Sequence, residues 1–110
     1  NANPAIRQQL EPVFTAKRAV ASLDTQIKSK QSQVDQIAGD QKRIRENLSA
    51  LKGTAEERAL AKRYTDELNQ QEDQLSTLRK DLDALQQQRQ TAQQDLADKI
   101  ENLNIEASPS

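Results

Sequence analysis

The chain of 110 residues has no cysteine, no histidine, no methionine and no tryptophan. Without cysteine it forms neither disulfides nor thiolate nucleophiles. Without histidine it lacks the commonest general base and the commonest metal ligand, and it cannot contain the Glu-x-x-His pattern of carboxylate metal sites in helical bundles. We therefore predict that this segment is not an enzyme and holds no cofactor and no metal.

Carboxylates are the remaining candidates for chemistry, and they cluster in the pairs Glu72–Asp73 and Asp81–Asp83. Residues one or two positions apart on a helix do not share a face, so neither pair brings two carboxylates together. A two-helix hairpin also lacks a pocket that excludes water and holds a substrate. We interpret these acidic side chains as solvated charge.

Long apolar runs are also missing, so the sequence predicts no transmembrane segment. The 16 basic and 17 acidic side chains nearly cancel, and the single Phe and single Tyr offer no stacking platform. No nucleic-acid partner is therefore expected. The charge is nevertheless uneven, because residues 41–63 carry seven basic and three acidic side chains, whereas residues 64–110 carry four and ten.

What the sequence does contain is a seven-residue repeat of apolar positions, which is typical of coiled coils. We call its a and d positions the seam. In the first half of the chain, the a positions are Ile6, Val13, Val20, Ile27, Val34, Gln41 and Leu48, and the d positions are Gln9, Ala16, Leu23, Lys30, Ile37, Ile44 and Leu51. In the second half, the a positions are Ala61, Leu68, Leu75, Leu82, Arg89, Leu96 and Leu103, and the d positions are Tyr64, Gln71, Leu78, Leu85, Ala92 and Lys99. A repeat of this length argues against disorder and predicts an all-α fold with two long helices.

The two helices are separated by a strong local signal at Gly53 and Thr54. Gly53 suits the left-handed position just after a helix, and Thr54 with Glu57 forms a capping-box pattern at the start of the next one. A connection this short places its two helices antiparallel and adjacent. We therefore predict an antiparallel two-helix coiled-coil hairpin (an αα-hairpin) with its tip at Gly53–Thr54.

Prolines and capping residues set the predicted boundaries. Asn3 followed by Pro4 is a helix-start signal, but Pro12 removes a backbone hydrogen bond and marks either a kink or the start of the long helix. Residues 1–11 are therefore predicted as a lead-in with a short helical turn, in which Asn1–Ala2 resembles a tag remnant. The remaining predictions are a long helix over 12–52, a turn over 53–54, a long helix over 55–105 and a disordered tail over 106–110.

Two alignments of the helices are compatible with the repeat. If facing residue numbers sum to 105, the turn is very tight and Asp24 is placed to pair with Arg79. If they sum to 112, the turn is wider and Gln41 faces Gln71, so that two polar seam residues hydrogen-bond and fix the alignment. Because exposed ion pairs contribute only roughly tenths of a kcal/mol, we favour the alignment with the Gln layer.

Two groups of side chains outside the seam are candidate interaction surfaces. Six basic residues flank the turn, and we call them the basic tip: Lys42, Arg43, Arg45, Arg58, Lys62 and Arg63. Apolar residues lie off the seam at the open end, where we call Leu10, Phe14 and Ile100 the docking base, with Ile105 nearby. The tip suits an acidic protein, a polyanion or anionic headgroups, or is ordinary surface charge. The base suits another packing element, or its residues cover one another.

Two stretches carry a resemblance to a known family: DQKRIRENL over residues 40–48, and KRYTDELNQQEDQLSTLRKDL over residues 62–82. With the intervening turn, they resemble the C-terminal helical segment of bacterial proteins called domain of unknown function four-one-three-nine. The resemblance implies a helical hairpin that follows a β-rich domain in proteins that are commonly exported. It brings no assigned activity and no catalytic residues.

The sequence thus predicts a non-enzymatic structural or protein-interaction arm of a larger bacterial protein of unassigned function. Its partner is expected to be another protein or the remainder of the parent chain. The alternative is an oligomerisation module, in which the docking base joins two hairpins into a homodimeric four-helix bundle. From the family resemblance alone, the chain is expected to be exported or periplasmic.

Overall fold

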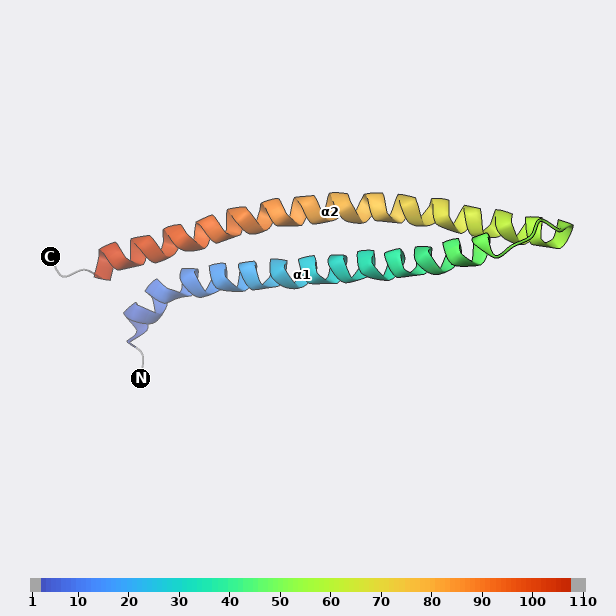
Figure 1. The fold of residues 1–110 in the computed structure, drawn as a ribbon. Helices are drawn as coiled ribbons and strands as arrows, with labels where there is room; N and C mark the ends of the chain where they lie inside the picture. Colours follow the sequence, from blue (N-terminus) through green and yellow to red (C-terminus); the bar gives the residue numbers. More distant parts are fainter. Residues whose placement is uncertain (1–2, 108–110) are drawn as a thin grey trace. The chain divides into compact units, whose positions relative to one another are not determined.

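The computed structural model describes the backbone of residues 3–107 and the side chains of residues 3–103. It contains two helices, α1 over Pro4–Ser49 and α2 over Ala55–Ala107, and the described residues include no strand. A short turn joins the helices, which run in opposite directions (Figure 1). The predicted all-α helical hairpin is confirmed.

Packing divides the chain into two compact units. The turn unit comprises Ser29–Leu82, and the open-end unit combines Asn1–Lys28 with Asp83–Ser110. In each unit, a segment of α1 packs against a segment of α2 and buries residues of the predicted seam. The buried apolar side chains of the turn unit are Ile44, Leu75 and Leu78. Those of the open-end unit are Val13, Ala16, Val20, Ile27 and Leu85.

The first turn of α1 is capped as the sequence predicts. The Ala5 backbone N–H donates to Oδ1 of Asn3 at 3.0 Å, and the Arg7 N–H donates to the Asn3 carbonyl at 3.0 Å. Pro4 occupies the first helical position, where its missing N–H removes no helical hydrogen bond. Asn3 therefore begins α1 through both its side chain and its backbone.

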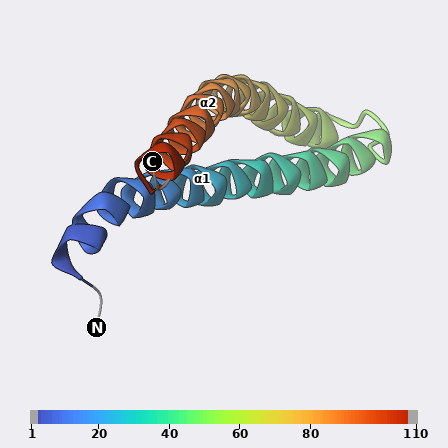
Figure 2. The same cartoon turned by 90° about the vertical axis from the view of Figure 1, so that its left-hand side faces the viewer.

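Pro12 lies inside α1 and does not begin it. The predicted division into a lead-in over 1–11 and a helix from residue 12 is wrong, because the helix runs unbroken from Pro4. Proline lacks the N–H that would bond to the Gln8 carbonyl, but Gln8 is exposed and water can satisfy that carbonyl. The turns before Pro12 bend away from α2 in both views (Figures 1 and 2). Ile6, in this bent segment, is 51% exposed although it occupies a seam position.

The end of α1 at Ser49 comes before the predicted end at Lys52. The N–H groups of Ala50 and Leu51 bond to carbonyls three residues back, at 3.3 and 3.1 Å, which tightens the last turn. The Lys52 N–H donates to Oε2 of Glu57 at 2.9 Å instead of to α1. The Lys52 N–H therefore belongs to the turn and not to the helix, and α1 ends at Ser49.

The turn itself forms around Gly53 and Thr54 as predicted. Gly53 has a φ of 85°, in the left-handed region that favours glycine. Oγ1 of Thr54 accepts the Glu57 N–H at 3.1 Å, and Oε1 of Glu57 accepts the Thr54 N–H at 3.2 Å, which completes the capping box. Because the other oxygen of Glu57 binds the Lys52 N–H, one carboxylate joins both sides of the turn, and α2 begins at Ala55.

The end of α2 lies at Ala107 and not at the predicted residue 105. The predicted tail over 106–110 is therefore wrong at residues 106 and 107. No glycine or proline occurs within α2 to end the helix earlier, and the next such residue is Pro109. Residues 108–110 of the predicted tail, and the predicted tag remnant Asn1–Ala2, lie outside the described residues.

A crossed pair of hydrogen bonds sets the alignment of the turn unit. Nε2 of Gln41 donates to Oε1 of Glu72 at 2.9 Å, and Nε2 of Gln71 donates to Oδ2 of Asp40 at 2.6 Å. Gln41 is buried and faces Gln71, as the alignment with facing numbers summing to 112 requires. The predicted layer is present, but each amide bonds to the carboxylate beside the other amide rather than to the amide itself. Oε1 of Gln71 is buried and has no hydrogen-bond partner among the described residues.

Two charged side chains at seam positions, like the two glutamines, pair with a carboxylate of the other helix. Lys30 forms an ion pair with Asp81 at 3.4 Å in the turn unit, and Arg89 pairs with Asp24 in the open-end unit. Asp81 and Asp24 occupy heptad positions beside the seam, where the cation of the opposite helix reaches them. Asp24 therefore pairs with Arg89 and not with Arg79, the partner that the tighter alignment predicts.

The two glycines are expected to respond in opposite directions to alanine substitution. An added Cβ meets no atom within 4 Å at either position. In Gly53→Ala, the φ of 85° strains the alanine backbone, and the unfolding free energy should fall by about 1 kcal/mol. In Gly39→Ala, a residue inside α1 gains helix propensity, and the unfolding free energy should rise by about 1 kcal/mol. Denaturant unfolding followed by circular dichroism measures both, and shifts of the same sign would contradict this account.

Candidate interaction surfaces

One carboxylate of each acidic pair in the sequence has a partner on α1. Glu72 accepts the Gln41 amide at 2.9 Å, and Asp81 pairs with Lys30 at 3.4 Å. Among the residues that the structure describes, no three acidic side chains are placed to hold a metal ion. Glu72 and Asp81 thus each link α2 to a side chain of α1.

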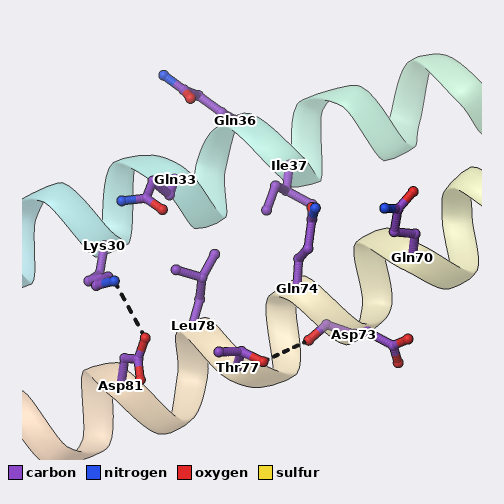
Figure 3. Close-up of a pocket in the computed structure, with 10 residues that line it drawn as sticks. All are labelled: Lys30, Gln33, Gln36, Ile37, Gln70, Asp73, Gln74, Thr77, Leu78 and Asp81. Carbon is purple, nitrogen blue, oxygen red and sulfur yellow. Dashed lines mark hydrogen bonds and ion pairs between the residues drawn. The ribbon is translucent and has the colours of Figure 1, made fainter.

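An open groove lies between α1 and α2 in the turn unit (Figure 3). Its lining is mostly amides and seam side chains: Lys30, Gln33, Gln36, Ile37, Gln70, Asp73, Gln74, Thr77, Leu78 and Asp81. Lys30 and Asp81, which line the groove, form an ion pair with each other. The Thr77 hydroxyl donates to the Asp73 carbonyl of its own helix at 3.2 Å. Figure 3 shows the Gln36 side chain pointing away from α2. The lining offers amide hydrogen-bonding groups and no reactive nucleophile.

All six residues of the basic tip are exposed. Three of them form ion pairs: Arg43–Asp40 at 2.8 Å, Arg45–Glu72 at 3.9 Å and Lys62–Asp66 at 3.5 Å. Within the part of the chain that the structure describes, no carboxylate lies within 4.0 Å of the charged groups of the other three, Lys42, Arg58 and Arg63. The tip therefore carries more positive charge than its neighbouring carboxylates neutralise.

The alignment of the helices separates the basic tip into two edges. Lys42 and Arg45 are three residues apart and share a face of α1, and Arg58 and Lys62 are four apart and share a face of α2. Glu72 lies two heptads after Arg58 on the same side of α2, and Arg45 reaches it across the helices at 3.9 Å. These four basic residues therefore lie on one side of the hairpin, and we call them the basic edge.

The other two residues of the tip lie beside acidic side chains. Nε of Arg43 donates to Oδ1 of Asp40 at 3.0 Å, and the charge of Glu67 contributes to a raised pKa of Arg43, after the larger effect of Asp40. Arg63 lies one helical turn before Glu67 on α2. We call Asp40, Arg43, Arg63 and Glu67 the mixed edge, because two basic and two acidic side chains balance there. This division into two edges was not predicted from the sequence, although it follows from the heptad positions once the alignment is known.

The docking base is partly covered. Leu10 is half-buried, whereas Phe14 is 45% and Ile100 is 40% exposed. Ile6 is a further exposed apolar side chain, which sequence analysis placed in the seam. Ile6, Leu10 and Phe14 are spaced by four residues and therefore share one face of α1. The side chain of Ile105 lies outside the described residues.

Hydrogen bonds hold two carboxyl groups of the turn unit in their ionised form. The Arg43 guanidinium, and after it the Gln71 amide, lower the pKa of Asp40 below its usual 3.8. The backbone N–H of Lys52 is the largest cause that lowers the pKa of Glu57 below its usual 4.5. Both shifts arise because the charged carboxylate accepts hydrogen bonds that its neutral form would lose.

Comparison of the chain with protein-family models, with curated proteins and with solved structures finds no match. The resemblance to domain of unknown function four-one-three-nine therefore stays a prediction. Neither helix, over the described residues, contains a segment that is both long and apolar enough to cross a bilayer.

Acid is expected to weaken the turn unit through Asp40. Because the pKa of Asp40 is lower in the folded chain than in the unfolded chain, unfolding takes up a proton. The stability that this group contributes is therefore present above about pH 4 and is lost as the pH falls further. Asp40→Asn should reduce the difference in thermal midpoint between neutral pH and about pH 2.5, as measured by circular dichroism.

Arg43→Gln provides the control for this pH prediction. It removes the hydrogen bond that lowers the pKa of Asp40 the most but keeps the carboxylate and the Gln71 amide, so the difference in midpoint should also shrink. A difference that stays at the wild-type value in both variants would show that these partners do not hold Asp40 ionised.

Proposed function

We propose that the chain is a non-enzymatic helical arm of a larger bacterial protein. In this proposal, the arm presents its turn to a protein partner and docks its open end on the remainder of the parent protein. The observation that carries the proposal is the group of exposed basic side chains around a turn that a capping box stabilises.

The use of apolar side chains supports an arm rather than a site for chemistry. All eight buried apolar side chains among the described residues occupy seam positions. The apolar surface is thus used to pair the helices, and the lining of the groove in Figure 3 is mostly amides and seam side chains. Such a structure provides length and surface but no water-excluding pocket in which a substrate could react.

The turn is well ordered for binding before any partner arrives. The Glu57 carboxylate accepts the N–H groups of Lys52 and Thr54, and Gly53 adopts the left-handed backbone that the turn requires. A surface that is ordered in advance loses less conformational entropy when it binds. The basic side chains on both sides of the turn are therefore carried on a backbone that hydrogen bonds already hold in place.

Neutralising the tip is expected to abolish partner capture. We would use the chain as bait in bacterial extract and compare it with a variant in which Arg43, Arg45, Lys62 and Arg63 are replaced by serine. Proteins retained by the wild type should be lost from the variant, because the exposed cations supply the attraction. If every retained protein is captured equally by both, the role of the tip in the proposal is wrong.

Self-association through the docking base is the alternative function, and exposed Phe14 and Ile100 favour it. Large apolar side chains that lie outside a coiled-coil seam often contact another element. In this alternative, the docking bases of two copies pack together and four helices form a bundle. The remainder of the parent protein then has no need to cover this surface.

Sedimentation velocity over a range of concentrations decides between these functions. For the arm, we expect a mass of 12.4 kDa at every concentration, the mass of one chain. For the alternative, the mass should rise toward twice that value, and Phe14→Ser combined with Ile100→Ser should return it to that of one chain. Arg45→Ser combined with Arg58→Ser is the control, because it changes the tip and leaves the docking base intact.

A further inference from the structure

We propose that the basic edge binds an acidic amphipathic helix of a partner protein, lying along the side of the turn unit. This inference rests on the proposed function, in which the turn meets a protein, and it adds the chemistry of that partner. It also assigns the contact to one side of the turn rather than to the whole basic tip.

The first support is the unequal charge of the two edges. The mixed edge balances two cations against two carboxylates, and Arg43 is held by Asp40 at 2.8 Å. The basic edge has four cations, and Glu72, the carboxylate on the same side of α2, already accepts the Gln41 amide at 2.9 Å. Arg45 reaches that carboxylate only at 3.9 Å, and the Lys62–Asp66 pair is largely exposed. Because such exposed pairs are weak, an external carboxylate can compete for these cations.

The second support is partly uncovered apolar surface beside the cations. Ile44 is fully buried in the seam, whereas Leu48, one turn nearer the end of α1, is half-buried. Leu48 follows Arg45 by three residues, and half-buried Ala61 follows Arg58 by three, so each lies next to a cation on its helix. A partner on this edge meets apolar surface flanked by positive charge. A helix with an apolar stripe between acidic flanks complements both features.

Other anionic partners fit this edge less well. The chain's one tyrosine, Tyr64, is half-buried and its hydroxyl accepts the Asn47 amide at 3.4 Å, so its ring is no free platform for stacking bases. The start of α2 presents exposed Glu56 next to Glu57, and these carboxylates disfavour an anionic membrane that approaches the turn end-on. A helix lying along the side of the hairpin avoids that end.

A defined peptide tests the proposal directly. The probe is a fluorescent synthetic peptide of roughly 20 residues, with leucines at i, i+3 and i+7 spacing on one face and glutamates on both sides of them. A scrambled peptide of the same composition keeps the charge but loses the apolar face. In anisotropy titrations, the chain should bind the periodic peptide at least about tenfold more tightly than the scrambled one.

Two double variants, each lacking two arginines, locate the contact. Arg45→Ser with Arg58→Ser changes the basic edge and should weaken binding of the periodic peptide by about tenfold or more. Arg43→Ser with Arg63→Ser changes the mixed edge and should weaken it by less than about threefold. All four positions are exposed, and circular dichroism verifies that both variants keep the helical content of the wild type.

Several results would overturn the proposal. Equal losses in the two double variants would mean that charge alone attracts the peptide, without a preferred edge. Equal affinity for the scrambled peptide, or no binding of either peptide, would exclude recognition of an amphipathic helix. Tighter binding to phosphatidylserine-containing vesicles or to a single-stranded oligonucleotide than to the periodic peptide would assign the edge to another class of partner.

The peptide titration and the capture experiment test different proposals, so either proposal can be wrong while the other stands. If neutralising the tip abolishes capture from extract but the periodic peptide does not bind, the arm proposal stands and the acidic helix is wrong. If capture is unchanged while the peptide binds only through the basic edge, the edge has the proposed chemistry but the retained proteins are not its partners.

Discussion

The crossed hydrogen bonds from Gln41 to Glu72 and from Gln71 to Asp40 are the constraint on which the rest of the turn unit depends. Layers of aliphatic side chains tolerate a slip of one heptad, because one apolar layer can replace another. The amides do not, because a slip would separate each from its carboxylate and leave buried polar groups without partners. Among the described residues, Oε1 of Gln71 is buried without a hydrogen-bond partner, and its desolvation is a stability cost of this specificity.

The alignment then decides which side chains share a surface. It brings Arg45 within 3.9 Å of Glu72, and it places Arg43 of α1 where the charge of Glu67 on α2 acts on its guanidinium. Six basic residues that look alike in the sequence become a basic edge and a mixed edge with different net charge. A surface of one sign on one side of a hairpin favours a partner that lies along that side. The function proposed for the turn therefore depends on the layer of Gln41 and Gln71, which sets this alignment.

Local signals predicted the hairpin well and its boundaries less well. The Asn3 cap, the left-handed Gly53 and the Thr54–Glu57 capping box all depend on neighbouring residues, and all three are present. Pro12 was expected to separate a lead-in from the helix, but an exposed proline costs the helix one bond that water replaces, and the chain bends instead. The end of α1 was misplaced because the Glu57 carboxylate, from the next helix, takes the Lys52 N–H.

The sequence by itself determined the all-α class, the two helices, the position of the turn and the residues available for the two candidate surfaces. It did so because heptad spacing and capping are patterns along the chain. Only the tertiary structure decided that amides bond to carboxylates across the layer, that Arg89 pairs with Asp24, and that the basic tip has two unlike edges. A seven-residue repeat matches itself at more than one alignment, so contacts between helices are settled only when their polar groups find partners in space.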